Sequence, residues 1–359
     1  MAGRNLILIA GALGVVGRSA LRYFESLPDW AVVGLSRRKP DFASSARFVE
    51  VDLTDADGCK AKLADTGAIT HVLYCANYEK PQLVSGWLEP DHVAVNLAML
   101  QNLMNGIGDK VGTLRHVVLM QGTKAYGAAA GPIKIPARES DPRYLAPNFY
   151  YAQEDYLKDA QRGSSWFWTI LRPQWVCGFA IGGSMNGMAA LGTLAAISRE
   201  LEQPLRFPGD HARLVEATDA GLLAAAVHWS MESPDCRNET FNIVNGDCFT
   251  WGNLWPRVAK LFDMECGPAL PHRLARVMWD KAAVWDRIVR RHGLKSYGLS
   301  QLVPNWEFAD NLFGYRAPPE PLLMSGIKAR KHGFGNCQDS EEMVLNWLRF
   351  MQAESVIPR

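Results

Sequence analysis

Two kinds of hydrophobic pattern alternate along the first part of the chain. Continuous runs of aliphatic and β-branched residues occupy positions 5–10, 31–36, 47–51, 71–75, 116–121 and 168–171, with segments of helical spacing between them. Parallel strands that are covered on both faces read as continuous apolar runs, and strands that alternate with helices are typical of βαβ units. The pattern predicts an α/β fold, a doubly wound parallel sheet that forms a Rossmann core over residues 1–172.

The pattern becomes irregular beyond Pro173. Turns that contain Gly and Pro separate two predicted helices, 185–201 and 217–230, and a further strand follows at 240–244. This part is rich in tryptophan and contains no repeat or low-complexity linker. We expect residues 173–359 to form a smaller substrate-covering lobe that packs against the core and returns elements to it.

Composition narrows the class of partner. The chain has 359 residues and a formal net charge of +1, with basic residues interleaved among acids, which argues against nucleic-acid binding. Its seven cysteines form no C-x-x-C pair and no disulfide-like spacing, which favours a reducing compartment. The longest apolar stretch, 185–197, is too short to cross a bilayer. We therefore expect a soluble cytoplasmic protein with a small-molecule partner, no metal, and a homodimer as a candidate assembly.

The first predicted strand runs directly into a glycine-rich turn. Gly11-Ala-Leu-Gly14-Val-Val-Gly17 lies between this strand and a helical segment at 18–26. In a dinucleotide-binding turn Gly11 permits the tight turn, Gly14 lets backbone N–H groups approach the pyrophosphate, and Gly17 lets the helix pack closely. An ordinary turn with helix-packing glycines is the alternative, and the flanking strand and helix make it the weaker one.

The ends of the second and third predicted strands bear on the choice of dinucleotide. Ser36-Arg37-Arg38 stands where an NAD enzyme usually carries an acidic residue for the ribose hydroxyls. A guanidinium suits a 2′-phosphate, so we expect NADPH, with Arg37 the more direct ligand; a solvated charge run is the alternative. Asp52 is placed to reach the adenine or is a plain N-cap or turn aspartate. The predicted cofactor-binding residues are Gly11, Gly14, Gly17, Ser36, Arg37, Arg38, Asp52, Leu53, Cys75 and Ala76.

A catalytic pair is expected near the same edge of the sheet. Hydride-transfer enzymes of this fold need a hydroxyl that donates to the substrate oxygen and a cation that lowers its pKa. The usual pair, Y-x-x-x-K, is absent, because Tyr150 is followed four residues on by Glu154. Lys124 lies just past the fifth predicted strand, where a strand end can present it to a tyrosine on the next helix. A buried structural tyrosine and a solvent-exposed lysine are the alternative.

The segment 148–155, Asn-Phe-Tyr-Tyr-Ala-Gln-Glu-Asp, together with the displaced Lys124, is the most specific motif. It resembles the progesterone 5β-reductase and iridoid synthase-like enone reductases, an atypical branch of the extended short-chain dehydrogenases. The resemblance spans nearly the whole chain and implies that Tyr150 and Lys124 are catalytic. It implies 1,4-reduction of an activated alkene by NADPH, with Tyr150, assisted by Lys124, stabilising the enolate oxygen. Residues 74–78 lack the tryptophan of the plant members, so the resemblance does not transfer the substrate.

Two other functions stay open on the sequence alone. Carbonyl reduction or nucleotide-sugar epimerisation is common in the parent superfamily, but the missing Y-x-x-x-K weighs against it. A non-catalytic dinucleotide sensor would keep the glycine turn and lose the tyrosine and lysine. Phe308, Trp306 and Met185 are candidate walls of an apolar pocket, or ordinary packed core.

Overall fold

The computed structural model describes residues 5–80, 82–315 and 320–359. Its main sheet has seven strands in the order β10-β6-β5-β4-β1-β2-β3, and every neighbouring pair is parallel. This confirms the predicted Rossmann sheet. The strands are β1 (Asn5–Ala10), β2 (Trp30–Ser36), β3 (Arg47–Glu50), β4 (His71–Tyr74), β5 (His116–Met120), β6 (Phe167–Pro173) and β10 (Glu239–Ile243).

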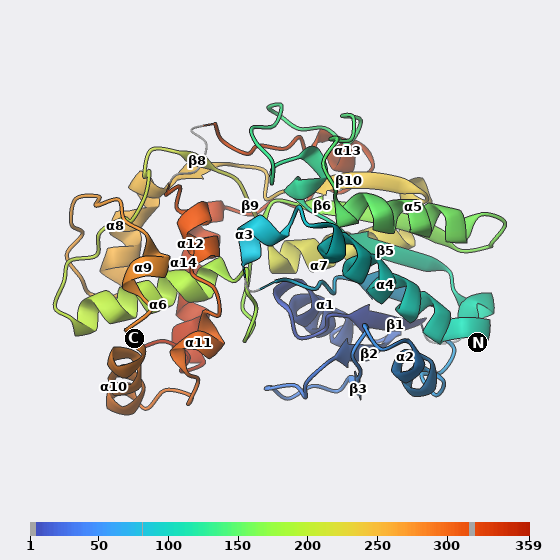
Figure 1. Cartoon of the computed structure of the whole chain (residues 1–359), viewed down its shortest axis with the longest axis horizontal. Helices are drawn as coiled ribbons and strands as arrows, with labels where there is room; N and C mark the ends of the chain where they lie inside the picture. Colours follow the sequence, from blue (N-terminus) through green and yellow to red (C-terminus); the bar gives the residue numbers. More distant parts are fainter. Residues whose placement is uncertain (1–4, 81, 316–319) are drawn as a thin grey trace.

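Helices cover both faces of this sheet (Figure 1). Alternate residues of β1 explain why its sequence is apolar throughout: Ile7 and Ile9 face one helical layer, and Leu8 and Ala10 face the other. The first layer contains α1 (Val15–Glu25) and α7 (Ala220–Glu232), and the second contains α2 (Ala56–Leu63), α4 (Pro90–Ile107) and α5 (Phe149–Gln161).

The order of the strands reverses between β1 and β4. Chain segments leave these two neighbours toward opposite halves of the sheet, which opens a crevice beyond their carboxyl ends. The turns after β1, β2, β4 and β5 therefore meet at one edge. Ligands of open α/β sheets bind at such a point.

The lobe beyond Pro173 lies beside this edge (Figure 1). Its helices enclose a core of their own, in which the rings of Phe207, Trp251, Trp255 and Phe313 lie 4.9–6.1 Å apart. The tryptophan-rich composition of the lobe thus serves packing in large part. The lobe helices are α6 (Gly187–Glu200), α8 (Trp251–Leu261), α9 (Leu274–Val277), α10 (Ala282–His292), α11 (Leu299–Leu302), α12 (Glu307–Leu312) and α14 (Ser340–Ala353).

Shorter elements complete the chain. Two small sheets pair β7 (Trp175–Cys177) with β9 (Ala217–Asp219) and β8 (Leu214–Val215) with β11 (Phe249–Thr250). The remaining short helices are α3 (Leu83–Gly86), α13 (Ile327–Lys331) and the 3₁₀ turns η1 (Gly108–Thr113), η2 (Thr123–Tyr126) and η3 (Pro234–Cys236).

One predicted helix starts later than expected. Residues 217–219 form strand β9, and α7 begins only at Ala220, because Thr218 donates its hydroxyl to the carbonyl of Ile243 and Asp219 caps the helix by accepting from the N–H of Leu222. All seven cysteines are free thiols. Within the described ranges, no helix combines the length and apolarity needed to span a membrane.

Candidate functional site

The glycine turn after β1 is built by close backbone approaches. Gly11 has φ of +84°, and a Cβ there would lie 2.9 Å from the backbone nitrogen of Ala76. A Cβ on Gly17 would lie 2.1 Å from the carbonyl oxygen of Gly11. Both glycines are therefore required by the fold itself.

Gly14 differs from its two neighbours in the motif. A Cβ there would meet only the Gly11 oxygen, at 3.4 Å, and Gly14 is the N-cap of α1 without a side-chain cap hydrogen bond. The N-terminus of α1 thus presents open N–H groups at the carboxyl edge of the sheet, where a helix favours an anion. Since the fold leaves room at Gly14, the requirement for glycine there is expected to come from a ligand.

Ser36 and Arg37 line the large cavity at this edge, whereas Arg38 does not. The guanidinium of Arg38 donates to the carbonyl of Ile181 and lies against Gly182, so it ties the Rossmann edge to the start of the lobe. Sequence reasoning grouped the two arginines as cofactor ligands, and the structure separates them.

The predicted residues after β3 and β4 also lie at the cavity. Asp52 accepts hydrogen bonds from the backbone N–H (2.9 Å) and hydroxyl (2.8 Å) of Thr54. The Thr54 backbone bond, with a contribution from Arg37, keeps the pKa of Asp52 below its ordinary value. Cys75 donates to the carbonyl of Ala10 at 3.0 Å, and burial raises the pKa of its thiol to about 12. This cysteine therefore serves the β1–β4 junction as a small, un-ionised side chain. The remaining predicted residues, Leu53 and Ala76, line the same cavity.

Helix α5 carries Tyr150 in its first turn, and its N-cap explains the Asn-Phe-Tyr-Tyr sequence. Asn148 accepts from the N–H of Tyr150 (3.0 Å) and donates its side-chain amide to the carbonyl of Lys124 (2.7 Å). Tyr151 donates its hydroxyl to the carbonyl of Ala125 (2.7 Å). One short segment therefore fixes the start of α5 and the turn η2 against each other, and it brings Tyr150 and Lys124 into one cavity.

The hydroxyl of Tyr150 lies over the turn after β5, where a Cβ on Gly122 would be 3.5 Å from it. Burial, and secondarily the charge of Glu79, raise the pKa of Tyr150 above its ordinary value. The sequence-based expectation of a pKa lowered by the lysine is therefore not met. A neutral tyrosine hydroxyl can donate a hydrogen bond to a ligand in the cavity.

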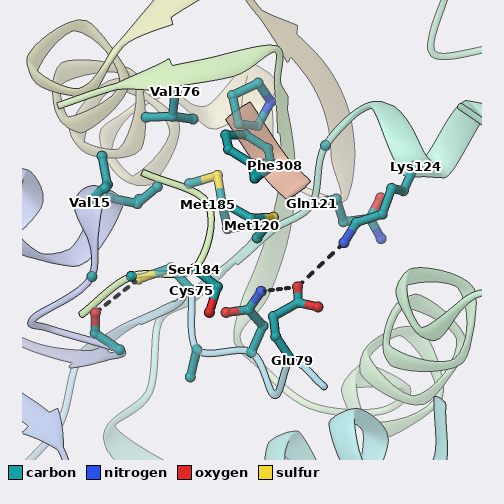
Figure 2. Close-up of a pocket in the computed structure, with 18 of the residues that line it drawn as sticks. Val15, Cys75, Glu79, Met120, Gln121, Lys124, Val176, Ser184, Met185 and Phe308 are labelled. Atoms are coloured by element: carbon teal, nitrogen blue, oxygen red, sulfur yellow. Dashed lines mark hydrogen bonds and ion pairs between the residues drawn. The ribbon is translucent and has the colours of Figure 1, made fainter. Parts of the chain in front are cut away.

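The side chain of Lys124 points into the cavity and is largely buried. Its Nζ lies 3.6 Å from Oε1 of Glu79 and 4.3 Å from the ring centre of Trp87 (Figure 2). Burial lowers the pKa of Lys124, and the Glu79 carboxylate opposes that shift. The solvated-lysine alternative is thus excluded.

The cavity has a volume of about 540 Å³ and extends from the glycine turn to the lobe. Met120, Met185 and Phe308 form an apolar wall beside Lys124 and Glu79 (Figure 2). Trp306 does not line the cavity and packs against the lobe core. A mostly apolar wall with few polar groups is typical of small-molecule sites.

Three lining or supporting residues escaped sequence reasoning: Glu79, Trp87 and Gln121. Gln121 donates to the carbonyl of Tyr150 at 3.0 Å and accepts from Nε of Arg172 at 2.8 Å. Its position at the end of the fifth predicted strand was a usable signal. Glu79 and Trp87 reach the site from a segment that carries no motif.

Known proteins resemble this chain over its whole length. The NAD dependent epimerase/dehydratase family matches residues 7–244. An (S)-8-oxocitronellyl enol synthase of Nepeta racemosa is 32% identical, over 99% of this chain and 93% of that protein. A 3-oxo-Delta(4,5)-steroid 5-beta-reductase of Arabidopsis thaliana is 31% identical, over 99% and 93%.

Solved structures agree with the fold. A UDP-glucose 4-epimerase from Thermotoga maritima superposes with a TM-score of 0.69 at 16% identity, covering 97% of this chain and 99% of that one. The UDP-glucose 4-epimerase of Thermus thermophilus in complex with NAD gives 0.65 at 17% identity, covering 96% and 99%. At such low identity the likeness speaks for the architecture alone.

Proposed function

The chain belongs to the NAD dependent epimerase/dehydratase family, in the branch of the enol synthases and the steroid 5-beta-reductase, and we propose that it reduces enones with NADPH. It is an oxidoreductase of the extended short-chain dehydrogenase type that uses a nicotinamide dinucleotide. The preference for NADPH, the residues that act and the direction of addition are our proposals. The observation that carries the assignment of the acting residues is the pairing of Tyr150 with Lys124 through Asn148, and the preference for NADPH rests on Arg37 at the cavity.

The dinucleotide fits the residues that are present. The open N-terminus of α1 at Gly14 suits the pyrophosphate, and the close approaches at Gly11 and Gly17 leave no side chain in its way. Arg37 would bind the 2′-phosphate, with Ser36 beside it. Leu53, Cys75 and Ala76 would border the adenosine and ribose, and Asp52 would orient this edge through its Thr54 turn.

When bound, NADPH supplies a hydride to the β-carbon of the enone. The alkene electron pair then moves toward the carbonyl oxygen, where negative charge develops. Tyr150 donates a hydrogen bond to this oxygen, and the cation of Lys124 stabilises the same charge. Because both groups are buried beside an apolar wall, water competes little for the oxygen.

The apolar wall indicates the class of substrate. Met120, Met185 and Phe308 offer contacts to a hydrocarbon frame, while Tyr150 and Lys124 are polar groups that line the same cavity. We propose a small, largely apolar enone. The cytoplasmic location and the homodimer stay predictions.

The test is steady-state kinetics of Tyr150→Phe and Lys124→Met on a graded series of enones. Loss of one oxyanion donor lowers kcat by about 10²–10³. The kcat of Tyr150→Phe should therefore fall by that factor, and the kcat of Lys124→Met by a smaller factor. NADPH affinity should stay nearly unchanged, and the deficit should grow for weakly activated alkenes.

Two outcomes contradict the proposal. Wild-type kcat in both variants, with folding verified by circular dichroism, would remove Tyr150 and Lys124 from the reaction. A wild-type enzyme that reduces only the carbonyl, or binds NADPH without turnover, would point to the carbonyl reductase or the sensor.

A further inference from the structure

The segment after β4 places a carboxylate against the predicted catalytic lysine. Oε1 of Glu79 lies 3.6 Å from Nζ of Lys124, and the two side chains point toward each other (Figure 2). Glu79 is fixed from two other directions: Nε1 of Trp87 donates to its Oε2 at 2.9 Å, and the Asn77 amide donates to its Oε1 at 2.8 Å. A side chain held by two donors cannot easily leave the lysine.

The rest of the surroundings of Lys124 is aromatic. Its Nζ lies 4.3, 5.3 and 5.6 Å from the ring centres of Trp87, Phe149 and Tyr150. Nζ is buried and has no hydrogen-bond partner within the described part of the chain. Ring faces attract a cation but cannot accept its protons as a carboxylate does. Glu79 therefore supplies the negative charge that faces the Lys124 nitrogen.

A histidine completes the set of titratable groups. His92 on α4 is fully buried, and its Nε2 lies 3.4 Å from Oε2 of Glu79, on the side away from the lysine contact at Oε1. Among the residues that the structure describes, the titratable groups that interact with the Glu79–Lys124 pair are His92 from α4 and Tyr150 from α5. Lys80 is engaged with Glu89 and Asp91.

We propose that Glu79 is a positioning residue of this enzyme, whose carboxylate keeps Lys124 charged and directed at the reacting oxygen beside Tyr150. The inference rests on the proposed function, since it acts through Lys124. It adds a residue that the glycine turn and the Tyr–Lys motif do not contain.

The groups around Lys124 determine the direction in which its pKa should change when Glu79 is replaced. Burial favours the neutral amine and lowers the pKa of Lys124, while Glu79 favours the ammonium. Burial alone would raise the pKa of Glu79. Lys124 and His92 outweigh this effect, so the pKa of Glu79 lies below its ordinary value. Removing the carboxylate leaves only burial and the ring faces, so Lys124 should lose its proton at lower pH.

The experiment compares the pH dependence of kcat in wild type and Glu79→Gln. Glutamine keeps the size of the side chain and an oxygen for Trp87, but it removes the charge. The basic limb of the profile should move to lower pH by at least about one unit, so the loss of kcat relative to wild type should grow as pH rises. Glu79→Asp, which restores the charge, should recover most of the shift.

The matched control is Glu89→Gln, which removes an exposed carboxylate that pairs with Lys80. It should leave the profile unchanged. An unshifted profile in Glu79→Gln, or an equal loss of kcat at every pH, would overturn the inference. A uniform loss would mean that Glu79 only supports the structure.

A second readout does not depend on turnover. NMR titration of the lysine side-chain signals, with Lys124 assigned by its absence in Lys124→Met, should show an ammonium at about pH 7 in wild type. A neutral Lys124 in wild type overturns the inference even if Glu79→Gln does not fold. If Lys124→Met keeps full activity, the proposed function fails; if Lys124→Met is impaired and the titration is unaffected by Glu79→Gln, only the inference fails.

Discussion

Backbone forms one end of the cavity, and side chains form the other. At the glycine turn, backbone meets backbone: Gly11 against Ala76 and Gly17 against the Gly11 carbonyl. At the other end, side chains from separate segments converge, with Glu79 after β4, Lys124 after β5 and Tyr150 on α5. A surface of backbone N–H groups suits any dinucleotide pyrophosphate, whereas converging side chains set the chemistry and can be changed one by one.

Substitutions at the two ends of the cavity should therefore act in different ways. A side chain added at the backbone end occupies space, so its effect is steric and large. A side chain removed at the other end changes charge or position, so its effect is graded and depends on pH or substrate.

Gly14→Val should produce the largest effect. The fold leaves room for a Cβ at Gly14, at 3.4 Å from the nearest atom, but the added methyl groups would occupy the space of the pyrophosphate. We expect NADPH affinity to fall by about 10³ or more with a loss of stability of only about 1 kcal/mol, since valine is a poor N-cap. Fluorescence titration and thermal unfolding measure the two quantities.

Gly17→Val is the matched contrast to that variant. Its Cβ would lie 2.1 Å from the Gly11 oxygen, so it should lose stability far more than Gly14→Val. Unchanged NADPH binding in Gly14→Val would contradict the assignment of this turn to the pyrophosphate.

Arg37→Asp tests the specificity of the same end. Charge-assisted hydrogen bonds to a 2′-phosphate contribute about 1.5–3 kcal/mol each, or roughly one to two decades. The ratio of kcat/KM for NADPH over NADH should fall by that amount. Arg38→Asp is the control, because Arg38 binds the Ile181 carbonyl, and it should change the ratio less. An equal fall of this ratio in the two variants would mean that Arg38 also binds the cofactor.

These contrasts also mark what the sequence could predict. The glycine turn and its flanking elements are contiguous, so local patterns were sufficient for them. The sequence could not distinguish Arg37 from Arg38, since the partner of Arg38 is 143 residues away. It could not choose Phe308 over Trp306 as a wall, because the faces of a short helix depend on what packs against it. Glu79 becomes recognisable only when burial and Lys124 surround it.

The two sides of the cavity also differ in the pKa of a carboxyl group. Asp52 at the nucleotide end has a lowered pKa, whereas burial raises the pKa of Glu216, on the lobe side of the cavity, to about 7. Folded Glu216 keeps its proton up to that pH, while the unfolded chain releases it near 4.5. The unfolded state therefore binds fewer protons between these values, so this group lowers stability as pH rises through the window.

Glu216→Gln should remove that loss. Relative to wild type, the variant should gain about 2 kcal/mol of unfolding free energy between about pH 5 and pH 8, as measured by urea unfolding at both values. Glu265→Gln, which removes an exposed carboxylate, is the control. A gain of the same size at both pH values would mean that Glu216 does not titrate in this range.

The smallest effect is expected at Asn148, which joins the helix cap to the catalytic lysine. Asn148→Ala loses both the acceptor for the N–H of Tyr150 and the donor to the carbonyl of Lys124, so it should cost about 1 kcal/mol of stability and about 5-fold in kcat through misplacement of Lys124. Asn148→Ser separates the two roles, because serine caps a helix but is too short to reach that carbonyl. It should keep nearly the stability of wild type and still lose kcat, while NADPH binding at the backbone end stays unchanged in both variants. If Asn148→Ser recovers kcat along with stability, the link between the cap and Lys124 has no part in the reaction, and the two ends of the cavity differ less than their construction indicates.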